Sequence, residues 1–313
     1  MQVKSSKKTV LITGANGFIG LNTVKIFSKR NEFDVYALVH KNISKELSSL
    51  ENIKIIQADV TDENLDIPEF DIVVHAMGLA KDIGNKEKFK KLNFDSVKII
   101  SKFAKEKFIY ISSTDVYGIK DFENADETTN YSNFPKNYYP EYKIKSELWL
   151  KNEYKKNYVI IRPAAVWGEN DLTLEKRVID FLKTSSYIVH FGKWKGKNRW
   201  PLASVENVAK TILAVCLSDI FDKQAINIID SKKTTIDEYY REIAKKYFPN
   251  KAFKTLCLPM QIGKIIGFVS TFLSNLLKLN DPIFDPTYYS LHHVSSNLDF
   301  DNKRMLSALE ILK

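Results

Sequence analysis

The sequence predicts an α/β fold in which helices cover both faces of a parallel sheet, with a smaller C-terminal α+β lobe attached. Short apolar, β-branched segments alternate with amphipathic helical segments over the first half of the chain, and a glycine-rich turn directly follows the first of them. With 313 residues, 44% of them hydrophobic, the chain is long enough to bury a large core. We therefore expect a Rossmann-type, doubly wound domain over residues 1–165 and a substrate-binding lobe over residues 166–313, with some of the later chain returning to the first domain.

The first expected strand is the apolar run 9–13, and it leads into glycines at the spacing GxxGxxG. A strand, a glycine turn and a helix in this order form a phosphate site, because free amides and the positive end of the helix dipole face the ligand. Gly14 allows the tight turn, Gly17 lets the backbone approach a pyrophosphate, and Gly20 lets the helix pack close to the strand. The alternative is a glycine-rich turn that binds no ligand. The expected dinucleotide contacts of this motif are Gly14, Asn16, Gly17, Phe18, Ile19 and Gly20.

The end of the second expected strand, 34–40, bears on the choice of nicotinamide cofactor. In dinucleotide-binding folds an acidic residue here binds the ribose 2′-hydroxyl of NAD, whereas a basic residue tolerates the 2′-phosphate of NADP. The segment ends with His40 and Lys41 and contains no acid at this point. This favours NADP(H) over NAD, with His40 and Lys41 as cofactor contacts. In the alternative interpretation both are exposed turn residues.

Further strands are expected at 53–56, 71–75 and 107–112, with an amphipathic helix over 87–105. The small residues that follow the strand 71–75 continue it as a floor for the site. The strand 107–112 leads into Ser113. Since open α/β sheets place their chemistry at the carboxyl ends of their strands, Ser113 is a candidate catalytic residue.

Tyr139 and Lys143 lie four residues apart at the start of a helix expected to run to about Lys156. This spacing places both on one face of the helix. A lysine ammonium favours the phenolate, so we expect it to lower the pKa of Tyr139 towards working pH. With the Ser113 hydroxyl nearby, these groups can move a proton at a carbinol or carbonyl while a nicotinamide takes or gives a hydride. A lone YxxxK pattern is weak evidence, and its combination with the glycine motif and Ser113 favours a catalytic role.

After a sixth expected strand the regular alternation stops. A basic, aromatic loop, 193–200, has the composition to stack a base and neutralise a diphosphate, although an exposed turn is the alternative. Thr235 and Glu238 have capping-box spacing and start a helix. The other elements expected here are strands at 158–161, 188–192 and 225–229, the last of which returns, and helices at 172–183 and 205–217.

Charge, cysteines and histidines argue against several classes of protein. The net charge is +9, but the lysines are scattered among glutamates, so we expect no nucleic-acid partner. Cys216 and Cys257 lie far apart without CxxC spacing, which indicates buried thiols in a reducing cytoplasm. The five histidines form no metal-ligand pattern, so no metal is expected. The polar, basic N-terminus leads straight into the first strand and does not resemble a secretory signal.

The most apolar stretch of the chain, 262–277, is interrupted by glycine, serine and lysine. It is too short and too polar to span a bilayer, so we expect no transmembrane segment. A lid or a core helix is the favoured interpretation, and a helix lying on a membrane surface is the alternative.

The motifs resemble those of the extended short-chain dehydrogenases/reductases, and more narrowly those of the NAD(P)-dependent sugar-nucleotide epimerases, dehydratases and reductases. The resemblance also includes Glu147, Arg162-Pro163 and the helix start at 205–209. It implies that Ser113, Tyr139 and Lys143 form the catalytic trio, with Lys143 also contacting the nicotinamide ribose. It further implies cofactor contacts at Asp59, Val60, Ala76 and Asn93, the last supporting Lys143 through water, and substrate contacts at Arg199 and Trp200.

The sequence departs from this family pattern in ways that bear on the reaction. Tyr142 and Pro140 replace smaller residues near the catalytic lysine without removing a catalytic group. The 4,6-dehydratases have an Asp-Glu pair after the catalytic hydroxyl residue, and here the pair is Thr114-Asp115. The acid/base set for eliminating water is therefore incomplete, and dehydration is disfavoured.

The resemblance implies a cytoplasmic enzyme that reduces a 4-ketosugar or epimerises C4 of a nucleotide-activated sugar in surface polysaccharide biosynthesis. A hydroxysteroid- or flavonoid-type alcohol dehydrogenase is the first alternative, supported by the apolar segment 262–277. A non-catalytic NAD(P)-binding sensor is the second, and the presence of Tyr139 and Lys143 argues against it. The sugar, the nucleotide and the direction of flux stay open, and the resemblance is compatible with a homodimer.

Overall fold

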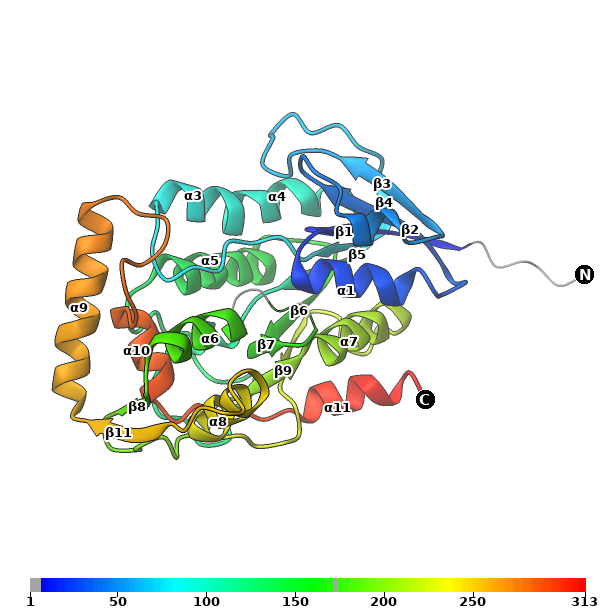
Figure 1. Cartoon of the computed structure of the whole chain (residues 1–313). Coiled ribbons are helices and arrows are strands. Elements are labelled where there is room, and N and C mark those ends of the chain that lie inside the picture. The colour runs from blue at the N-terminus through cyan, green and yellow to red at the C-terminus, as the bar shows by residue number, and fades with distance from the viewer. Residues whose placement is uncertain (1–6, 170, 172–173) are drawn as a thin grey trace, which may run out of the picture.

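The computed structural model describes residues 7–169, 171 and 174–313 (Figure 1). Its centre is a seven-stranded sheet with the order β10-β6-β5-β4-β1-β2-β3, in which every neighbouring pair is parallel. The predicted doubly wound parallel sheet is confirmed. The order reverses between β1 and β4, and ligands of such sheets bind beyond the carboxyl ends of the strands at this reversal. The strands are β1 Lys8–Thr13, β2 Phe33–Val39, β3 Ile53–Gln57, β4 Phe70–His75, β5 Ala104–Ile111, β6 Asn157–Pro163 and β10 Gln224–Ile228.

Helices cover both faces of the sheet, because the side chains of its central strands alternate between two apolar layers (Figure 1). Val10 and Ile12 of β1 face one layer, and Leu11 faces the other. The first layer includes helices α1 Phe18–Phe27, α7 Val205–Leu217 and α11 Lys303–Glu310. The opposite layer includes α4 Ser96–Ser101 and α5 Tyr138–Asn152. Two short helices complete this half of the chain, α2 Lys45–Ser48, whose Leu47 belongs to the first layer, and α3 Lys86–Lys90.

The helix expected over 87–105 differs from the structure in two ways. It contains a π-helical turn, η1 Lys91–Asp95, between α3 and α4, and it ends at Ser101. The following strand, expected at Lys107, already begins at Ala104. The reason is pairing in the sheet, since Ala104 lies opposite Phe70 of β4 and the Phe70 amide donates to the Phe103 carbonyl at 2.8 Å.

The second half of the chain adds two small parallel sheets and several helices. Strands β7 Ala165–Trp167 and β9 Leu202–Ser204 form one sheet, and β8 Tyr187–Phe191 and β11 Lys254–Leu258 form the other. The expected helix start at Leu172 falls outside the described residues, as do residues 1–6. The domain boundary at 165/166 stays a prediction, although β10 does join the main sheet. The helices of this half, besides α7 and α11, are α6 Leu174–Thr184, α8 Ile236–Tyr247, α9 Met260–Leu276 and α10 Tyr288–Ser295.

A buried ion pair anchors α5 to the sheet. The side chains of Glu147 on α5 and Arg162 on β6 are 0% and 1% exposed, and Arg162 Nε donates to Glu147 Oε1 at 3.0 Å. The hydroxyls of Ser112, at the end of β5, and Tyr131 also donate to the carboxylate, at 2.6 and 2.7 Å. Arg162 Nη1 donates to the Tyr117 hydroxyl at 2.6 Å.

These partners decide the charge state of the pair. Burial opposes ionisation of Glu147, but Arg162 and the hydroxyls of Ser112 and Tyr131 outweigh it and lower the pKa of the carboxyl. Glu147 therefore stays charged inside the protein. Because it bonds to groups on β5 and β6 at once, it fixes the helix that carries Tyr139 and Lys143 against the carboxyl ends of both strands.

Glu147→Gln is expected to lower the free energy of unfolding by about 3–5 kcal/mol, because it leaves the Arg162 guanidinium buried without a counter-charge. The shift of the urea unfolding midpoint at constant slope measures this loss. The matched control is Glu141→Gln on the same helix, whose ion pair with Lys145 at 2.7 Å is partly exposed. The control should cost less than about 0.5 kcal/mol. Equal losses for the two variants would contradict the anchoring role.

Candidate active site

The glycine turn after β1 has a geometry that larger residues could not adopt. Gly14 has a φ of 65°, and a Cβ on it would lie 3.0 Å from the backbone of Met77. A Cβ on Gly20 would lie 2.1 Å from the carbonyl oxygen of Gly14. The Gly17 amide donates to the Gly14 carbonyl at 2.8 Å and closes the turn. The glycines thus bring β1, the start of α1 and the segment after β4 into direct contact.

The N-terminus of α1 fits the pyrophosphate of a dinucleotide. The helix begins after Gly17, no side chain among the described residues caps it, and no acidic residue lies in its first turn. Its first backbone N–H groups therefore remain available to an anion. Ile19 packs against the core beneath, and the ring of Phe18 lies 3.4 Å from the position of a Cβ on Gly168.

The side chains expected at the adenosine end lie along the turns after β2 and β3. Asn16 donates to the carbonyl of Asn42 and accepts from the Ser44 amide at 3.0 Å, which ties the glycine turn to the chain after β2. His40 and Lys41 are exposed. The Asp59 carboxylate lies 3.7 Å from His40 Nε2. An acidic side chain thus lies beside His40, although it belongs to the chain after β3 and not to the end of β2.

Val60, next to Asp59, differs from these exposed groups. Its side chain is 7% exposed and packs in the apolar layer under α4 and α5. In the structure Val60 is therefore a packing residue, and an adenine contact would have to come from its backbone.

Asn93 fixes the segment that follows β4. It lies in the π-helical turn η1, and its side chain exchanges two hydrogen bonds with the backbone of Leu79, at 2.8 and 3.0 Å. A Cβ on Gly78 would lie 2.9 Å from Asn93 Oδ1 and 3.1 Å from Lys143 Nζ. Asn93, Lys143 and the segment of Ala76 to Gly78 thus meet at one point.

The structure brings the three expected catalytic residues together at the carboxyl end of β5. Lys143 Nζ donates to the carbonyl of Ile111 at 2.7 Å and lies 5.8 Å from the centroid of the Tyr139 ring. The Ser113 hydroxyl lies within reach of the Tyr139 phenol and accepts from the Asp115 amide at 3.1 Å. Both Ser113 and Lys143 are buried, at 8% and 4% exposure. A substrate oxygen that reaches Tyr139 would therefore also lie next to Ser113.

The charges in the trio differ from the expectation for Tyr139. Burial of the phenol raises the pKa of Tyr139 well above its ordinary value, Asp115 raises it further, and the Ser113 hydrogen bond lowers it only in part. The prediction that Lys143 lowers the pKa of Tyr139 is therefore wrong for this structure. Burial lowers the pKa of Lys143 itself to about 7, against an opposing effect of Glu147. Tyr139 is thus held in its protonated form, ready to donate a proton.

Three further side chains, Asp115, Tyr289 and His293, lie near the trio. The Asp115 carboxylate accepts from the Tyr289 hydroxyl at 2.5 Å and lies 3.3 Å from His293 Nε2, and both partners belong to α10. Burial opposes ionisation of Asp115, but His293 and the bonded hydroxyls lower the pKa of its carboxyl. For Asp115 the sequence signal was the Thr114-Asp115 pair after Ser113, whereas no local pattern pointed to Tyr289 and His293, because α10 lies far along the chain.

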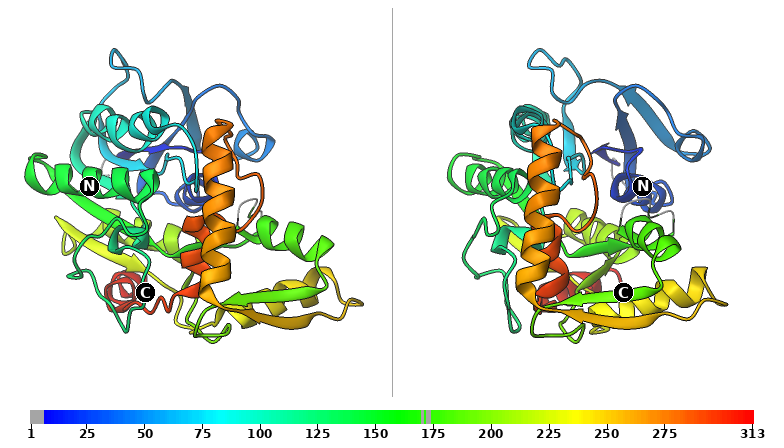
Figure 2. Two further views of the ribbon diagram at one scale, coloured as in Figure 1. Left: turned by 90° about the vertical axis from the view of Figure 1, so that its left-hand side faces the viewer. Right: turned by 60° about the vertical axis from the view of Figure 1, so that its left-hand side comes forward.

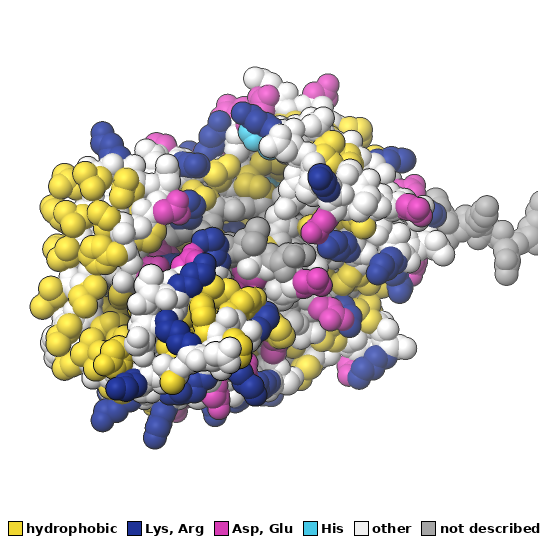
Figure 3. All heavy atoms as spheres, viewed as in Figure 1, with side chains coloured by type: hydrophobic (Ala, Val, Ile, Leu, Met, Phe, Trp, Pro, Cys, Tyr) yellow, Lys and Arg dark blue, Asp and Glu magenta, His cyan; other side chains and the backbone are white. Residues whose placement is uncertain are grey.

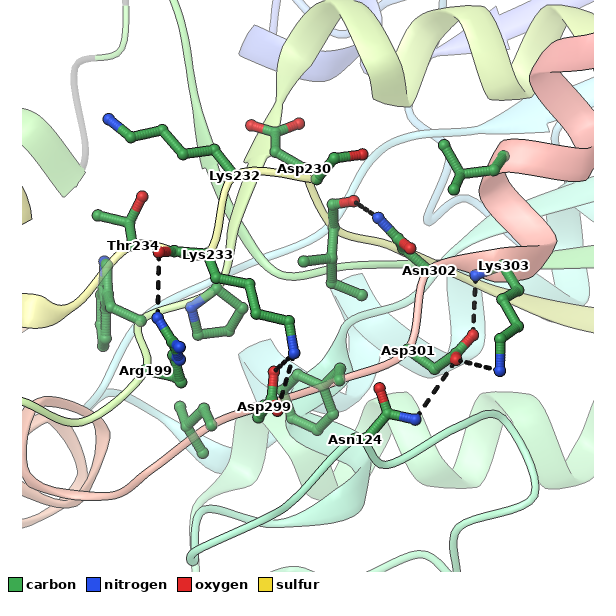
Figure 4. Close-up of a pocket in the computed structure, with 17 residues that line it drawn as sticks. Asn124, Arg199, Asp230, Lys232, Lys233, Thr234, Asp299, Asp301, Asn302 and Lys303 are labelled. Carbon is green, nitrogen blue, oxygen red and sulfur yellow. Dashed lines mark hydrogen bonds and ion pairs between the residues drawn. The ribbon is translucent and has the colours of Figure 1, made fainter.

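The two expected substrate residues line the same pocket, but their side chains have different neighbours. Trp200 is 5% exposed, and its ring packs edge-on against His293 with 6.1 Å between the ring centroids. The Arg199 guanidinium donates to the carbonyl of Lys233 at 3.2 Å and lines a pocket that also holds Lys232 and Lys303 (Figure 4). None of Ser113, Tyr139 and Lys143 lines that pocket. Trp200 therefore approaches the catalytic trio through His293, and the role of Arg199 stays a prediction.

In the part of the chain that the structure describes, no cluster of three or more histidine, cysteine or carboxylate side chains could hold a metal ion. No helix of that part is long and apolar enough to cross a membrane. Cys216 is a buried free thiol, as expected, but the prediction of burial is wrong for Cys257, which is exposed on β11.

Comparison with known proteins gives one family and several individual relatives. The family model described as "NAD dependent epimerase/dehydratase family" matches residues 10–228, from β1 to the end of β10. A UDP-glucose 4-epimerase of Vibrio cholerae is 25% identical over 249 residues, covering 76% of this chain and 75% of the relative. A decarboxylating sterol-4-alpha-carboxylate 3-dehydrogenase of Candida albicans is 23% identical over 317 residues, covering 91% and 87%.

Solved structures share the whole architecture. A UDP-N-acetylglucosamine 4-epimerase of Methanobrevibacter ruminantium, in complex with UDP-N-acetylmuramic acid, matches with a TM-score of 0.66. The match covers 93% of this chain and 97% of that one at 22% identity, a level at which the likeness shows the fold alone.

Proposed function

This chain belongs to the NAD-dependent epimerase/dehydratase family, and from this premise we propose that it is an NAD(P)-dependent oxidoreductase or epimerase of a nucleotide-activated sugar. The main support for this proposal is that Ser113, Tyr139 and Lys143 lie together at the carboxyl end of β5. Gly78 touches this trio, and its neighbour Met77 touches the glycine turn. A continuous chain of contacts thus joins the phosphate site to the reacting groups.

The residues that would hold the cofactor follow from the fit described above. When bound, a nicotinamide dinucleotide accepts or supplies a hydride. The proposed contacts of its phosphates, ribose and base are Gly14, Asn16, Gly17, Phe18, Ile19, Gly20, His40, Lys41, Asp59, Val60, Ala76, Asn93 and Lys143.

Proton transfer is assigned to Tyr139. Its hydroxyl donates a proton to a substrate carbonyl oxygen, and the Ser113 hydroxyl holds that oxygen in place. Lys143 is anchored on the Ile111 carbonyl and lies against the Tyr139 ring, so the ammonium form of Lys143 stabilises the phenolate left behind. Burial and Asp115 keep Tyr139 protonated in this structure, which is the form that donates the proton when a ketone is reduced. We therefore propose 4-ketosugar reduction ahead of C4 epimerisation.

Two features bear on the cofactor in opposite directions. His40 and Lys41 suit the 2′-phosphate of NADP, whereas Asp59 beside His40 suits the 2′-hydroxyl of NAD. Within the proposal NADP(H) remains the preferred cofactor, because an exchangeable NADPH suits a reductase. A role in surface polysaccharide biosynthesis in the cytoplasm belongs to the same proposal, as does a homodimer.

One relative supports a second candidate function. The sterol dehydrogenase of Candida albicans covers more of this chain than the Vibrio epimerase does, 91% against 76%. An alcohol dehydrogenase of apolar substrates could use the same trio. The apolar segment 262–277 no longer favours this alternative, since most of its large side chains point to solvent rather than into the protein.

Analysis of the bound nucleotide and of substrate turnover tests the proposal. We expect protein purified from cells to release little nicotinamide nucleotide on denaturation, to bind NADPH in preference to NADH, and to reduce a nucleotide 4-ketosugar. If the purified protein instead retains one NAD per chain, it is an epimerase, because an epimerase must keep its cofactor to return the hydride that it removes. Turnover of sterols or other apolar alcohols, with no nucleotide sugar accepted, would overturn the sugar substrate.

Tyr139→Phe is expected to reduce turnover by roughly 10²–10⁴-fold, because the variant cannot donate the proton. Cofactor affinity, measured by fluorescence titration, should stay unchanged. Tyr138→Phe is the matched control, since Tyr138 packs against Phe89 and should keep its activity. Normal activity of Tyr139→Phe would exclude the proposed mechanism.

Asp115→Asn should lower the pKa of Tyr139, since the carboxylate is one cause of its raised value. In the direction of alcohol oxidation, which needs the phenolate, log kcat/KM rises with pH as Tyr139 loses its proton. The rise should therefore begin at lower pH in the variant. Asp121→Asn, which removes a carboxylate bound to Lys193 and Trp194, is the control and should keep the original profile. Superimposable profiles for Asp115→Asn and the unmodified protein would refute the coupling.

A further inference from the structure

Helix α9 presents an apolar face to solvent. In both views of Figure 2 it forms a single straight helix on the outside of the molecule, and Figure 3 shows hydrophobic side chains gathered over it. At 17 residues it is roughly 25 Å long. Large side chains are well exposed along its whole length, including Ile265 at 66%, Phe268 at 63% and Leu276 at 64%. The others on this face and the adjoining turn are Ile262, Val269, Phe272, Leu277, Leu279, Ile283 and Phe284.

The orientation of α9 is fixed by the small residues on its other face. Gly263, Gly267, Ser270 and Ser274 are the buried residues of the helix. A Cβ on Gly267 would lie 2.9 Å from the Tyr288 Cα, so the backbones of α9 and α10 touch. The Ser274 hydroxyl accepts from the Ile283 amide at 3.0 Å. Rotating α9 to bury its large residues would break these contacts. The exposure of the apolar face therefore follows from the way α9 packs on the rest of the protein.

The charged side chains of the segment that carries this face are all lysines. The segment 251–280 contains four lysines and no acidic residue. Lys254, Lys264 and Lys278 are exposed. The nearest carboxylates along the chain are already paired, Asp281 with Lys81 at 2.8 Å and Asp285 with Arg177 at 2.5 Å. The apolar face thus combines aromatic and aliphatic groups with lysines whose charge no neighbouring acid in the segment neutralises.

We propose that α9 docks this protein on an anionic lipid surface, with the helix lying in the plane of the headgroups. A helix with an apolar face and flanking lysines gains both from burial of the side chains at the acyl boundary and from attraction to lipid phosphates. A second copy of the chain fits less well, because two such faces bring lysines together without carboxylates from this segment. The inference is independent of the substrate of the enzyme.

The apolar face of α9 lies close to the candidate active site, because α10 contacts both. Helix α10 touches α9 through Tyr288 and bonds to Asp115 through Tyr289, its next residue. Docking therefore places the catalytic trio one helix away from the lipid surface. An enzyme held in this way would act on substrate made or consumed at the membrane.

Cosedimentation with lipid vesicles tests the proposal on the full chain. We expect binding to vesicles of equal parts phosphatidylcholine and phosphatidylglycerol, and at least about tenfold weaker binding to phosphatidylcholine alone. The triple variant I265Q/F268Q/F272Q should lose binding by about tenfold or more while keeping its secondary structure and enzymatic activity. The control I220Q removes a side chain that is 62% exposed outside α9 and should bind normally.

The lysines are tested separately from the apolar groups. Lys264→Gln with Lys278→Gln should weaken binding to the anionic vesicles and reduce its dependence on salt, whereas Lys303→Gln, also highly exposed, should not. Absence of vesicle binding by the unmodified protein, or equal binding by the triple variant, would overturn the proposal. So would a stable dimer in light scattering that the triple variant dissociates without any vesicle binding, because α9 would then be a self-interface.

Discussion

The candidate site depends above all on the buried ion pair between Glu147 and Arg162. Two charges removed from water destabilise a protein unless each finds good partners, and here Ser112 and Tyr131 complete the shell around the carboxylate. The pair joins the middle of α5 to β5 and β6, the strands whose ends form the floor of the site. Tyr139 and Lys143 belong to the same helix, so their positions relative to Ser113 follow from this one anchor.

Burial near that anchor also decides the charges of the reacting groups. Lys143 lies closer to neutrality than a surface lysine, and Tyr139 loses its proton less readily than a free phenol. Asp115, held by two residues of α10, adds a negative charge beside Tyr139. The C-terminal part of the chain therefore adjusts the acid–base chemistry of residues that belong to the N-terminal sheet.

Helix α10 links this chemistry to the surface of the molecule. One of its faces meets Asp115, and its N-terminus meets the glycine of α9 at backbone distance. The small residues of α9 make that close contact, and as a consequence its large apolar residues face outwards. A hydrophobic stretch that suggested a core helix thus forms an exposed apolar surface. Which residues of α9 are buried is decided by its close contact with α10, and not by their hydrophobicity alone.

The sequence by itself determined the parallel sheet, the glycine turn and the meeting of Ser113 with Tyr139 and Lys143. These follow from local periodicity, from the need for glycine at a positive φ, and from the rule that parallel strands end at one edge. Only the tertiary structure decided the raised pKa of Tyr139, the approach of His293 to Asp115, the early start of β5 and the outward face of α9. Each of these depends on contacts between segments far apart in the chain, where burial and pairing override local propensity.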